Sequence, residues 1–191
     1  MRVAAAQISC TLGDFDANLR KVGDVAARAK KSGAALIVFP EMIDTGYSMP
    51  TIQEHARPWN EGAAMDLRKI AKKHSIAIVA GISDRAGDSI FNAQVFVSGS
   101  GEILGKYRKT HLVTAAPLDE RVCFSSGNDF VVCKMNEFNI GLSICYDLRF
   151  PEMARWLAVR RQANVIVNSS AWPVVRAEHL RILALARAVE N

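Results

Sequence analysis

"GLSICYDLRFPE", residues 141–152, places a cysteine between a run of small and apolar residues and the polar triplet Tyr-Asp-Arg. Pro151 favours the first position of a helix and Glu152 favours the first turn, so the stretch predicts a strand that ends near Cys145 and turns sharply into a helix. A cysteine at such a turn is either a small core residue, the commonest state of a free cysteine, or a nucleophile presented at the end of a strand. The residues in the rest of the chain decide between the two.

Apolar runs of strand length alternate with helical periodicity along the chain. Residues 2–9 and 34–39 are predicted strands, joined by a helix that ends at Gly33. A second helix is predicted over residues 61–74, with Asn60 as its cap. The remaining expected elements are strands at 76–82, 89–98, 102–109, 129–135, 138–145 and 164–170, and helices at 151–161 and 175–191.

This order of elements predicts the fold class. Helices that alternate with buried strands, interrupted by hairpins, are typical of a layered α/β domain with a mixed sheet. The chain has 191 residues, of which 50% are hydrophobic and 23% charged, enough for a sizeable core. Because no repeat or linker divides it, residues 1–191 are expected to form one domain.

Charge and hydropathy exclude two classes of partner. The formal charge is +5, but acidic residues interleave with the basic ones and no recognition motif accompanies them, so no nucleic-acid partner is expected. No apolar run approaches the roughly 18 residues of a membrane span, and the N-terminus lacks the pattern of a signal peptide. The expectation is a cytoplasmic protein without a membrane partner.

The sequence offers no pattern for a metal or a cofactor. The histidines are dispersed and no HExxH motif occurs. Neither a CxxC pair nor metal-ligand spacing appears among the cysteines, which are expected to be reduced: Cys10, Cys123, Cys133 and Cys145.

Three polar residues follow predicted strands directly: Glu41, Lys109 and Cys145. Ligand sites of α/β sheets collect beyond the carboxyl ends of strands, so these residues are expected to converge. A thiol with a pKa of about 8.5 needs a base, a cation or a helix N-terminus to become a useful nucleophile. Glu41 supplies the base, Lys109 the cation and the helix at Pro151 the N-terminus.

The segments around these residues resemble a known family. "FPEM" (39–42), "GKYRKTHL" (105–112) and residues 141–152 are similar, in this order, to the three signature segments of the nitrilase superfamily of carbon-nitrogen hydrolases. The resemblance covers practically the whole chain and implies an αββα sandwich with a Glu41-Lys109-Cys145 triad and no cofactor. Relatives continue past residue 191, so the resemblance implies a C-terminally truncated member without the last strands.

The same resemblance singles out Glu120 as a fourth catalytic residue, because relatives carry a second glutamate shortly before a Phe and Gly segment. Phe124 and Gly127 occupy those places here. The alternatives are that Glu120 is a surface carboxylate, or that Asp119 takes the role.

The segment "CYDLRFPE" resembles the amidase branches, above all the omega-amidase-like enzymes, whereas true nitrilases carry Cys-Trp-Glu at the nucleophile. The implied function is hydrolysis of a small primary amide to a carboxylic acid and ammonia through a thioester on Cys145. The alternatives are a nitrilase, an N-carbamoyl amino acid hydrolase, or a non-catalytic member with a binding or structural role. A serine hydrolase is disfavoured, because "GLSIC" has Cys145 where the G-x-S-x-G elbow needs glycine.

Four residues are expected to bind the substrate: Tyr47, Tyr146, Arg149 and Trp172. The resemblance implies that the Tyr146 backbone N–H helps Lys109 to hold the oxyanion. Trp172 is either core or pocket wall. Relatives also form a homodimer through the helix at residues 181–191, and a homodimer or higher homo-oligomer is expected here.

Arg149 has two interpretations. Its guanidinium either binds an acidic end of the substrate or forms a salt bridge to Asp147 or Glu152, which are close in sequence.

Overall fold

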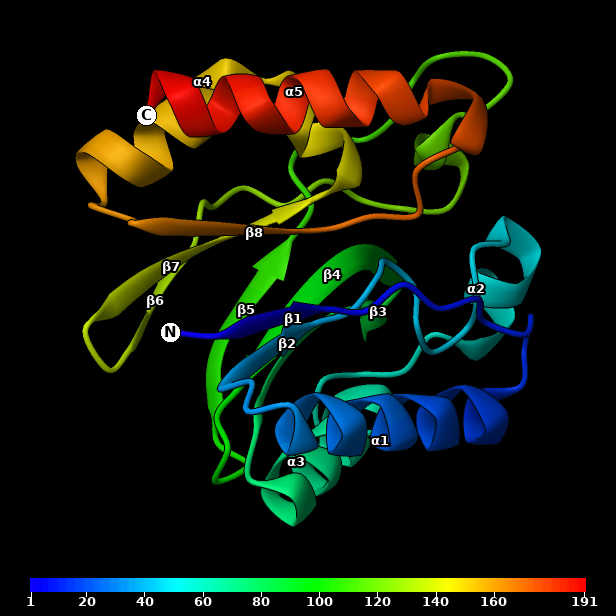
Figure 1. Ribbon diagram of the computed structural model, residues 1–191. Coiled ribbons are helices and arrows are strands. Elements are labelled where there is room, and N and C mark those ends of the chain that lie inside the picture. The colour runs from blue at the N-terminus through cyan, green and yellow to red at the C-terminus, as the bar shows by residue number, and fades with distance from the viewer.

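The computed structural model describes residues 1–191, and its layers are two β-sheets with helices on their outer faces. In Figure 1, α1 and α3 lie below the lower sheet, and α4 and α5 lie above the upper one. The chain therefore has the expected α/β class and the αββα sandwich order.

The larger sheet has five strands in the order β1-β2-β3-β4-β5. Its first three strands are parallel, whereas β3, β4 and β5 form an antiparallel meander. The expected hairpin around residues 99–101 is confirmed. The strands are β1 (Val3–Ala5), β2 (Leu36–Val38), β3 (Ala77–Ala86), β4 (Ser89–Val97) and β5 (Ile103–Arg108).

The smaller sheet has three strands in the order β6-β7-β8. The pair β6 and β7 is an antiparallel hairpin that turns at Asn136 with a φ of 53°, and β7 and β8 are parallel. Asparagine tolerates this left-handed conformation, which suits a tight hairpin. The strands are β6 (Val132–Met135), β7 (Phe138–Ile144) and β8 (Val165–Ser169).

Five α-helices and several short helical turns complete the fold. The α-helices are α1 (Phe15–Lys31), α2 (Met49–His55), α3 (Ala63–His74), α4 (Pro151–Arg155) and α5 (Ala177–Glu190). Three 3-10 helices and one π-helix occupy Glu120–Val122, Cys145–Arg149, Val174–Arg176 and Trp156–Arg160.

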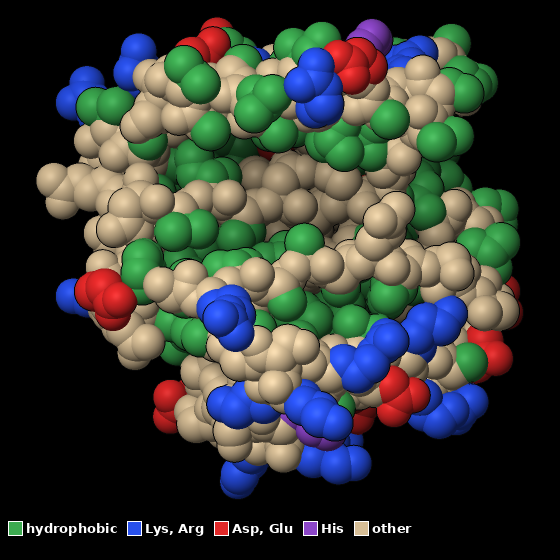
Figure 2. All heavy atoms as spheres, in the orientation of Figure 1, with side chains coloured by type: hydrophobic (Ala, Val, Ile, Leu, Met, Phe, Trp, Pro, Cys, Tyr) green, Lys and Arg blue, Asp and Glu red, His purple; other side chains and the backbone are tan.

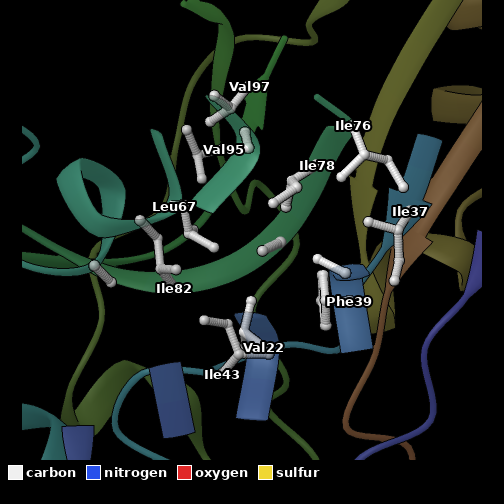
Figure 3. Packing of buried hydrophobic residues seen from close by; sticks show 14 of the residues in the cluster. Val22, Ile37, Phe39, Ile43, Leu67, Ile76, Ile78, Ile82, Val95 and Val97 are labelled. Carbon is white, nitrogen blue, oxygen red and sulfur yellow. The ribbon is translucent and has the colours of Figure 1, made fainter. Parts of the chain in front are cut away.

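Alternation along β3 divides the core into two layers. Ile78 and Ile82 face the helices, where they belong to one cluster with Val22 and Leu67 (Figure 3). Val79, between them in sequence, points the other way into a second cluster with residues of the smaller sheet. Because successive side chains of a strand alternate, β3 is buried on both faces, which explains its nearly continuous apolar sequence.

Some local predictions were wrong. Asn60 does not cap α3: Gly62 is the capping residue, with a φ of 63°, and it makes no side-chain hydrogen bond. The chain turns before the helix, where the Glu61 N–H donates to the Pro58 carbonyl, so the helix starts after that turn. Helix α2 was not predicted, and the first strand is shorter than residues 2–9.

A groove of about 650 Å³ opens between the edge strands β1 and β8 and helix α5. Figure 2 shows hydrophobic side chains along this hollow. Helix α5 has no buried residue, and Ile182, Leu185 and Val189 are 51%, 53% and 86% exposed. A homodimer through this helix stays a prediction.

No helix of the chain combines the length and the apolar character that a membrane crossing requires.

Candidate active site

Glu41, Lys109, Glu120 and Cys145 lie together although they come from four separate segments. Glu41 follows β2, and Lys109 follows β5 directly. Glu120 opens the 3-10 helix that ends at Val122, and Cys145 follows β7 in the smaller sheet. The site therefore lies between the two sheets, at the ends of their strands.

The Lys109 ammonium lies between two carboxylates. Its Nζ is 3.0 Å from Glu41 Oε1 and 2.9 Å from Glu120 Oε2, and all three side chains are buried. Burial by itself would lower the pKa of Lys109, but Glu41 and Glu120 together raise that pKa above its usual value. The lysine is therefore a fixed positive charge.

Each oxygen of Glu41 has a defined partner. Oε1 accepts hydrogen bonds from Lys109 Nζ at 3.0 Å and from Asn92 Nδ2 at 2.6 Å, and Oε2 accepts one from the Ala171 N–H at 3.0 Å. The backbone here passes close to β3: a Cβ at Gly81 would lie 2.5 Å from Glu41 Cα. Glycine at position 81 therefore allows the approach that brings Glu41 into the site.

Glu120 is buried and its carboxylate is saturated with donors. Tyr47 Oη donates to Oε1 at 2.5 Å, and the Val113 N–H donates to Oε2 at 2.6 Å. Asp119, the alternative residue, forms an exposed ion pair with Arg121. The surface interpretation of Glu120 is wrong, because the loop turns this side chain inward.

Cys145 sits in a strained turn. Its φ is 42°, in the left-handed region that side chains other than glycine rarely adopt, and such strain is typical of functional positions. Burial raises the pKa of its thiol well above the usual value, the Glu41 carboxylate raises it further, and Lys109 acts in the opposite direction. The resting thiol is therefore protonated. The Lys109 charge lowers the pKa of the thiol by less than burial and Glu41 raise it. The N-terminus of α4 is not at the thiol, because this helix begins only at Pro151.

Asp147 fastens the Cys145 turn to the Lys109 segment. Oδ2 accepts hydrogen bonds from the Ile144 N–H at 2.9 Å and from Tyr107 Oη at 2.7 Å. Oδ1 accepts from the His111 N–H at 3.1 Å and lies 2.8 Å from His111 Nδ1. One buried carboxylate thus links residues on both sides of Lys109 to the strand that leads to Cys145.

A pocket of about 390 Å³ opens onto the thiol. Glu41 and Cys145 lie at one end of it, and the remaining walls are mostly apolar. All four residues expected to bind substrate line it, together with the loop at residues 113–118: Tyr47, Tyr146, Arg149 and Trp172.

Comparison with known proteins agrees with this arrangement. Residues 2–191 match the family described as Carbon-nitrogen hydrolase. The chain belongs to this family. A 2-oxoglutaramate amidase from Bacillus subtilis is 32% identical over 99% of this chain and 72% of its own length. A nitrilase from Pyrococcus abyssi is 35% identical over 88% of this chain and 64% of its own length.

Solved structures place the chain within the nitrilase superfamily. The amidase from Nesterenkonia sp. AN1, in a structure with acrylamide added to its active site cysteine, superposes with a TM-score of 0.91. It is 30% identical, and the match covers 100% of this chain and 75% of that one. The chain is thus an amidase-type carbon-nitrogen hydrolase.

Arg149 of the hydrolase pairs with neither Asp147 nor Glu152. Its guanidinium lies 5.5 Å from the Tyr146 ring centroid and 5.1 Å from that of Trp172. Its only polar contact is with His179 Nδ1, at 3.5 Å. The arginine therefore faces the pocket with its charge unpaired.

Trp172 is half-buried against the core and also lines the pocket, so both interpretations of it apply.

One residue of the hydrolase's site was not predicted from the sequence. Asn92 on β4 donates to Glu41 at 2.6 Å and to Glu120 at 3.1 Å. A signal was present: Asn92 and Gln94 are amides at alternate positions of an otherwise apolar strand, so both point to one face. No group of three or more potential metal ligands gathers in the structure.

Proposed function

We propose that the hydrolase cleaves a small primary amide with a distal carboxylate, releasing ammonia and a carboxylic acid. The observation that carries the proposal is the convergence of a protonated thiol, a carboxylate and a fixed ammonium at the end of one pocket. The Bacillus subtilis relative is named for an amide of this kind, 2-oxoglutaramate.

The first half of the reaction acylates Cys145. Sγ attacks the amide carbon while Glu41 accepts the thiol proton, a step that the raised pKa of the thiol makes necessary. The developing oxyanion is stabilised by Lys109 and by the Tyr146 backbone N–H, and donors of this type contribute about 3 to 4 kcal/mol each. The C–N bond then breaks as Glu41 returns the proton to the departing ammonia, leaving a thioester.

The second half regenerates the enzyme. Glu41 removes a proton from a water molecule, whose oxygen adds to the thioester carbon. The C–S bond breaks, the carboxylic acid leaves and Cys145 recovers the proton from Glu41. Glu120 supports both halves of the reaction because its 2.9 Å ion pair holds the Lys109 ammonium in place. Lys109 also pairs with Glu41.

The distal end of the substrate meets two cations. Arg149 and Arg176 both line the pocket, and neither forms an ion pair with a carboxylate of the chain. A carboxylate bound by a guanidinium gains roughly 1.5 to 3 kcal/mol. Acidic amides should therefore react faster than neutral amides of the same length.

Ammonia release against a panel of amides, nitriles and N-carbamoyl amino acids tests the reaction type. We expect acidic primary amides to give the highest kcat/KM. Faster turnover of nitriles of matched size would assign the chain to the nitrilases. Faster turnover of N-carbamoyl amino acids would assign it to the N-carbamoyl amino acid hydrolases. No turnover of any compound would favour a binding role.

The substrate end is tested separately with the Arg149→Ala variant. Its kcat/KM for the acidic amide should fall by about tenfold to a hundredfold, with little change for the neutral amide. Arg161→Ala is the matched control, because Arg161 also lies over a tryptophan, 5.1 Å from the Trp156 ring, outside the pocket. Equal losses on both substrates would remove the carboxylate-binding role and leave a general amide hydrolase.

A further inference from the structure

Asn92 contacts most of the catalytic cluster from within the larger sheet. It lies on β4 opposite Ser83, is 0% exposed, and its backbone carbonyl accepts the Lys109 N–H at 2.8 Å. Its side-chain Nδ2 donates to Oε1 of Glu41 at 2.6 Å and to Oε1 of Glu120 at 3.1 Å. One amide therefore touches both carboxylates through its side chain and the lysine through its backbone.

The charges of the cluster explain why a neutral donor is useful there. Two carboxylates share a single ammonium, so their negative charges repel each other and need further donors to hold them in place. An amide NH₂ has two N–H bonds, and each carboxylate receives one without a further buried charge. The 2.6 Å hydrogen bond therefore fixes Oε1 of Glu41 between Asn92 and Lys109, whose Nζ lies 3.0 Å away.

The amide oxygen of Asn92 shows that packing alone does not explain why an amide occupies this position. Asn92 Oδ1 is buried and has no hydrogen-bond partner, which is unfavourable for a polar atom. Rotating the amide would satisfy neither carboxylate, because Oδ1 would then face Glu41 and Glu120. The two acceptors thus hold the side chain in its observed orientation.

We propose that Asn92 is a positioning residue that keeps Glu41 aimed at the nucleophile, a role that rests on the proposed function of Glu41 as general base. It acts through Glu41 and Glu120 and does not contact the reacting atoms. The other ionisable groups at this cluster are Lys109, Tyr47 and the Cys145 thiol.

The chain offers a matched control two residues along the same strand. Gln94 is also a buried amide with 0% exposure, and its Oε1 also lacks a partner. Its Nε2 donates to Ser169 Oγ at 2.8 Å, away from the catalytic carboxylates. A purely structural effect of removing a buried amide should therefore appear equally in Asn92→Ala and Gln94→Ala.

The decisive measurement separates kcat from KM in both variants. We expect the kcat of Asn92→Ala to fall roughly tenfold to a hundredfold with KM little changed, because a misplaced base slows proton transfer without altering the walls that bind substrate. Gln94→Ala should keep the kcat of the wild-type enzyme. An unchanged kcat in Asn92→Ala, or equal losses in both variants, would overturn the proposal.

A second measurement needs no substrate and separates this proposal from the proposed function. The rate of iodoacetamide alkylation of Cys145 at a fixed neutral pH reports how well Glu41 takes the thiol proton, and this rate should fall in Asn92→Ala only. That fall would support Asn92 even if the wild-type chain hydrolyses none of the amides, and its absence would overturn the role of Asn92 even if it does. Should Asn92→Ala fail to fold, as judged by circular dichroism, Asn92→Ser is measured with the same criteria.

Discussion

The two sides of the catalytic pocket differ in how firmly they are held. On one side, Glu41, Lys109 and Glu120 are 4%, 1% and 0% exposed, and hydrogen bonds reach each charged group. On the other side, Arg149 and Trp172 are half-exposed and meet mainly through aromatic contacts. The first side is preorganised for one chemistry, whereas the second can be altered with little effect on the rest of the fold. The proposed function therefore assigns the reaction to the first side and the choice of acyl group to the second.

The largest loss of activity should come from Cys145→Ala, because the buried charged side of the pocket (Glu41, Lys109 and Glu120) has no function without the nucleophile. Ammonia release should disappear, while the circular dichroism spectrum stays that of the wild-type chain, since only one small group is lost. Residual turnover within a hundredfold of wild type would mean that another group attacks the amide.

Lys109→Arg tests whether the buried charged side of the pocket tolerates a different cation at the position of the lysine. A planar guanidinium cannot replace a compact ammonium between two carboxylates at 3.0 and 2.9 Å, so kcat/KM should fall about a thousandfold, nearly as far as in Lys109→Ala. Lys106→Arg is the control, because Lys106 is exposed on β5, the strand that leads to Lys109. Activity of Lys109→Arg within tenfold of wild type would show that the lysine is only a neighbour of the site.

Glu120→Gln should have an intermediate effect, about tenfold to a hundredfold on kcat, since it removes one of the two negative partners of Lys109. Asp119→Asn, one residue earlier and exposed, should leave kcat unchanged. A larger loss in Glu120→Gln than in Glu41→Gln would exchange the roles assigned to the two glutamates.

The smallest expected effect concerns stability. Cys145 has a φ of 42°, a conformation that costs residues with a Cβ about 1 to 2 kcal/mol relative to glycine. Cys145→Gly should therefore be about 1 kcal/mol more stable to urea than Cys145→Ala, although both are inactive. If Cys145→Ala is the more stable of the two, the turn is not strained.

The sequence predicts most of the elements because their local patterns are clear. The apolar runs of β3 and β4 and the helical spacing of α1 indicate a layered α/β domain, whereas the two-sheet order of the sandwich was implied by the family resemblance. The short helix α2 and the turn before α3 depend on contacts that no local pattern records. The same holds for the inward turn of Glu120, which a loop position does not indicate.

The candidate site is predictable for charged residues and less so for neutral ones. Glu41, Lys109 and Cys145 were indicated by their positions after strands, and the structure brings them together. Asn92 and Asp147 matter through what they bond to across the fold, at separations of 51 and 36 residues for the bonds to Glu41 and His111. Such partners are known only once the strands are in register.

The division of the site between the sheets makes catalysis depend on their docking. The strands of the larger sheet lead to Glu41 and Lys109, and the smaller sheet leads to Cys145. Each sheet keeps its own backbone hydrogen bonds, so a slight separation of the two would leave the secondary structure intact and still part Glu41 from Cys145. In a denaturant titration, turnover should therefore vanish before the helices and strands do, and the enzyme itself reports whether its two layers are docked.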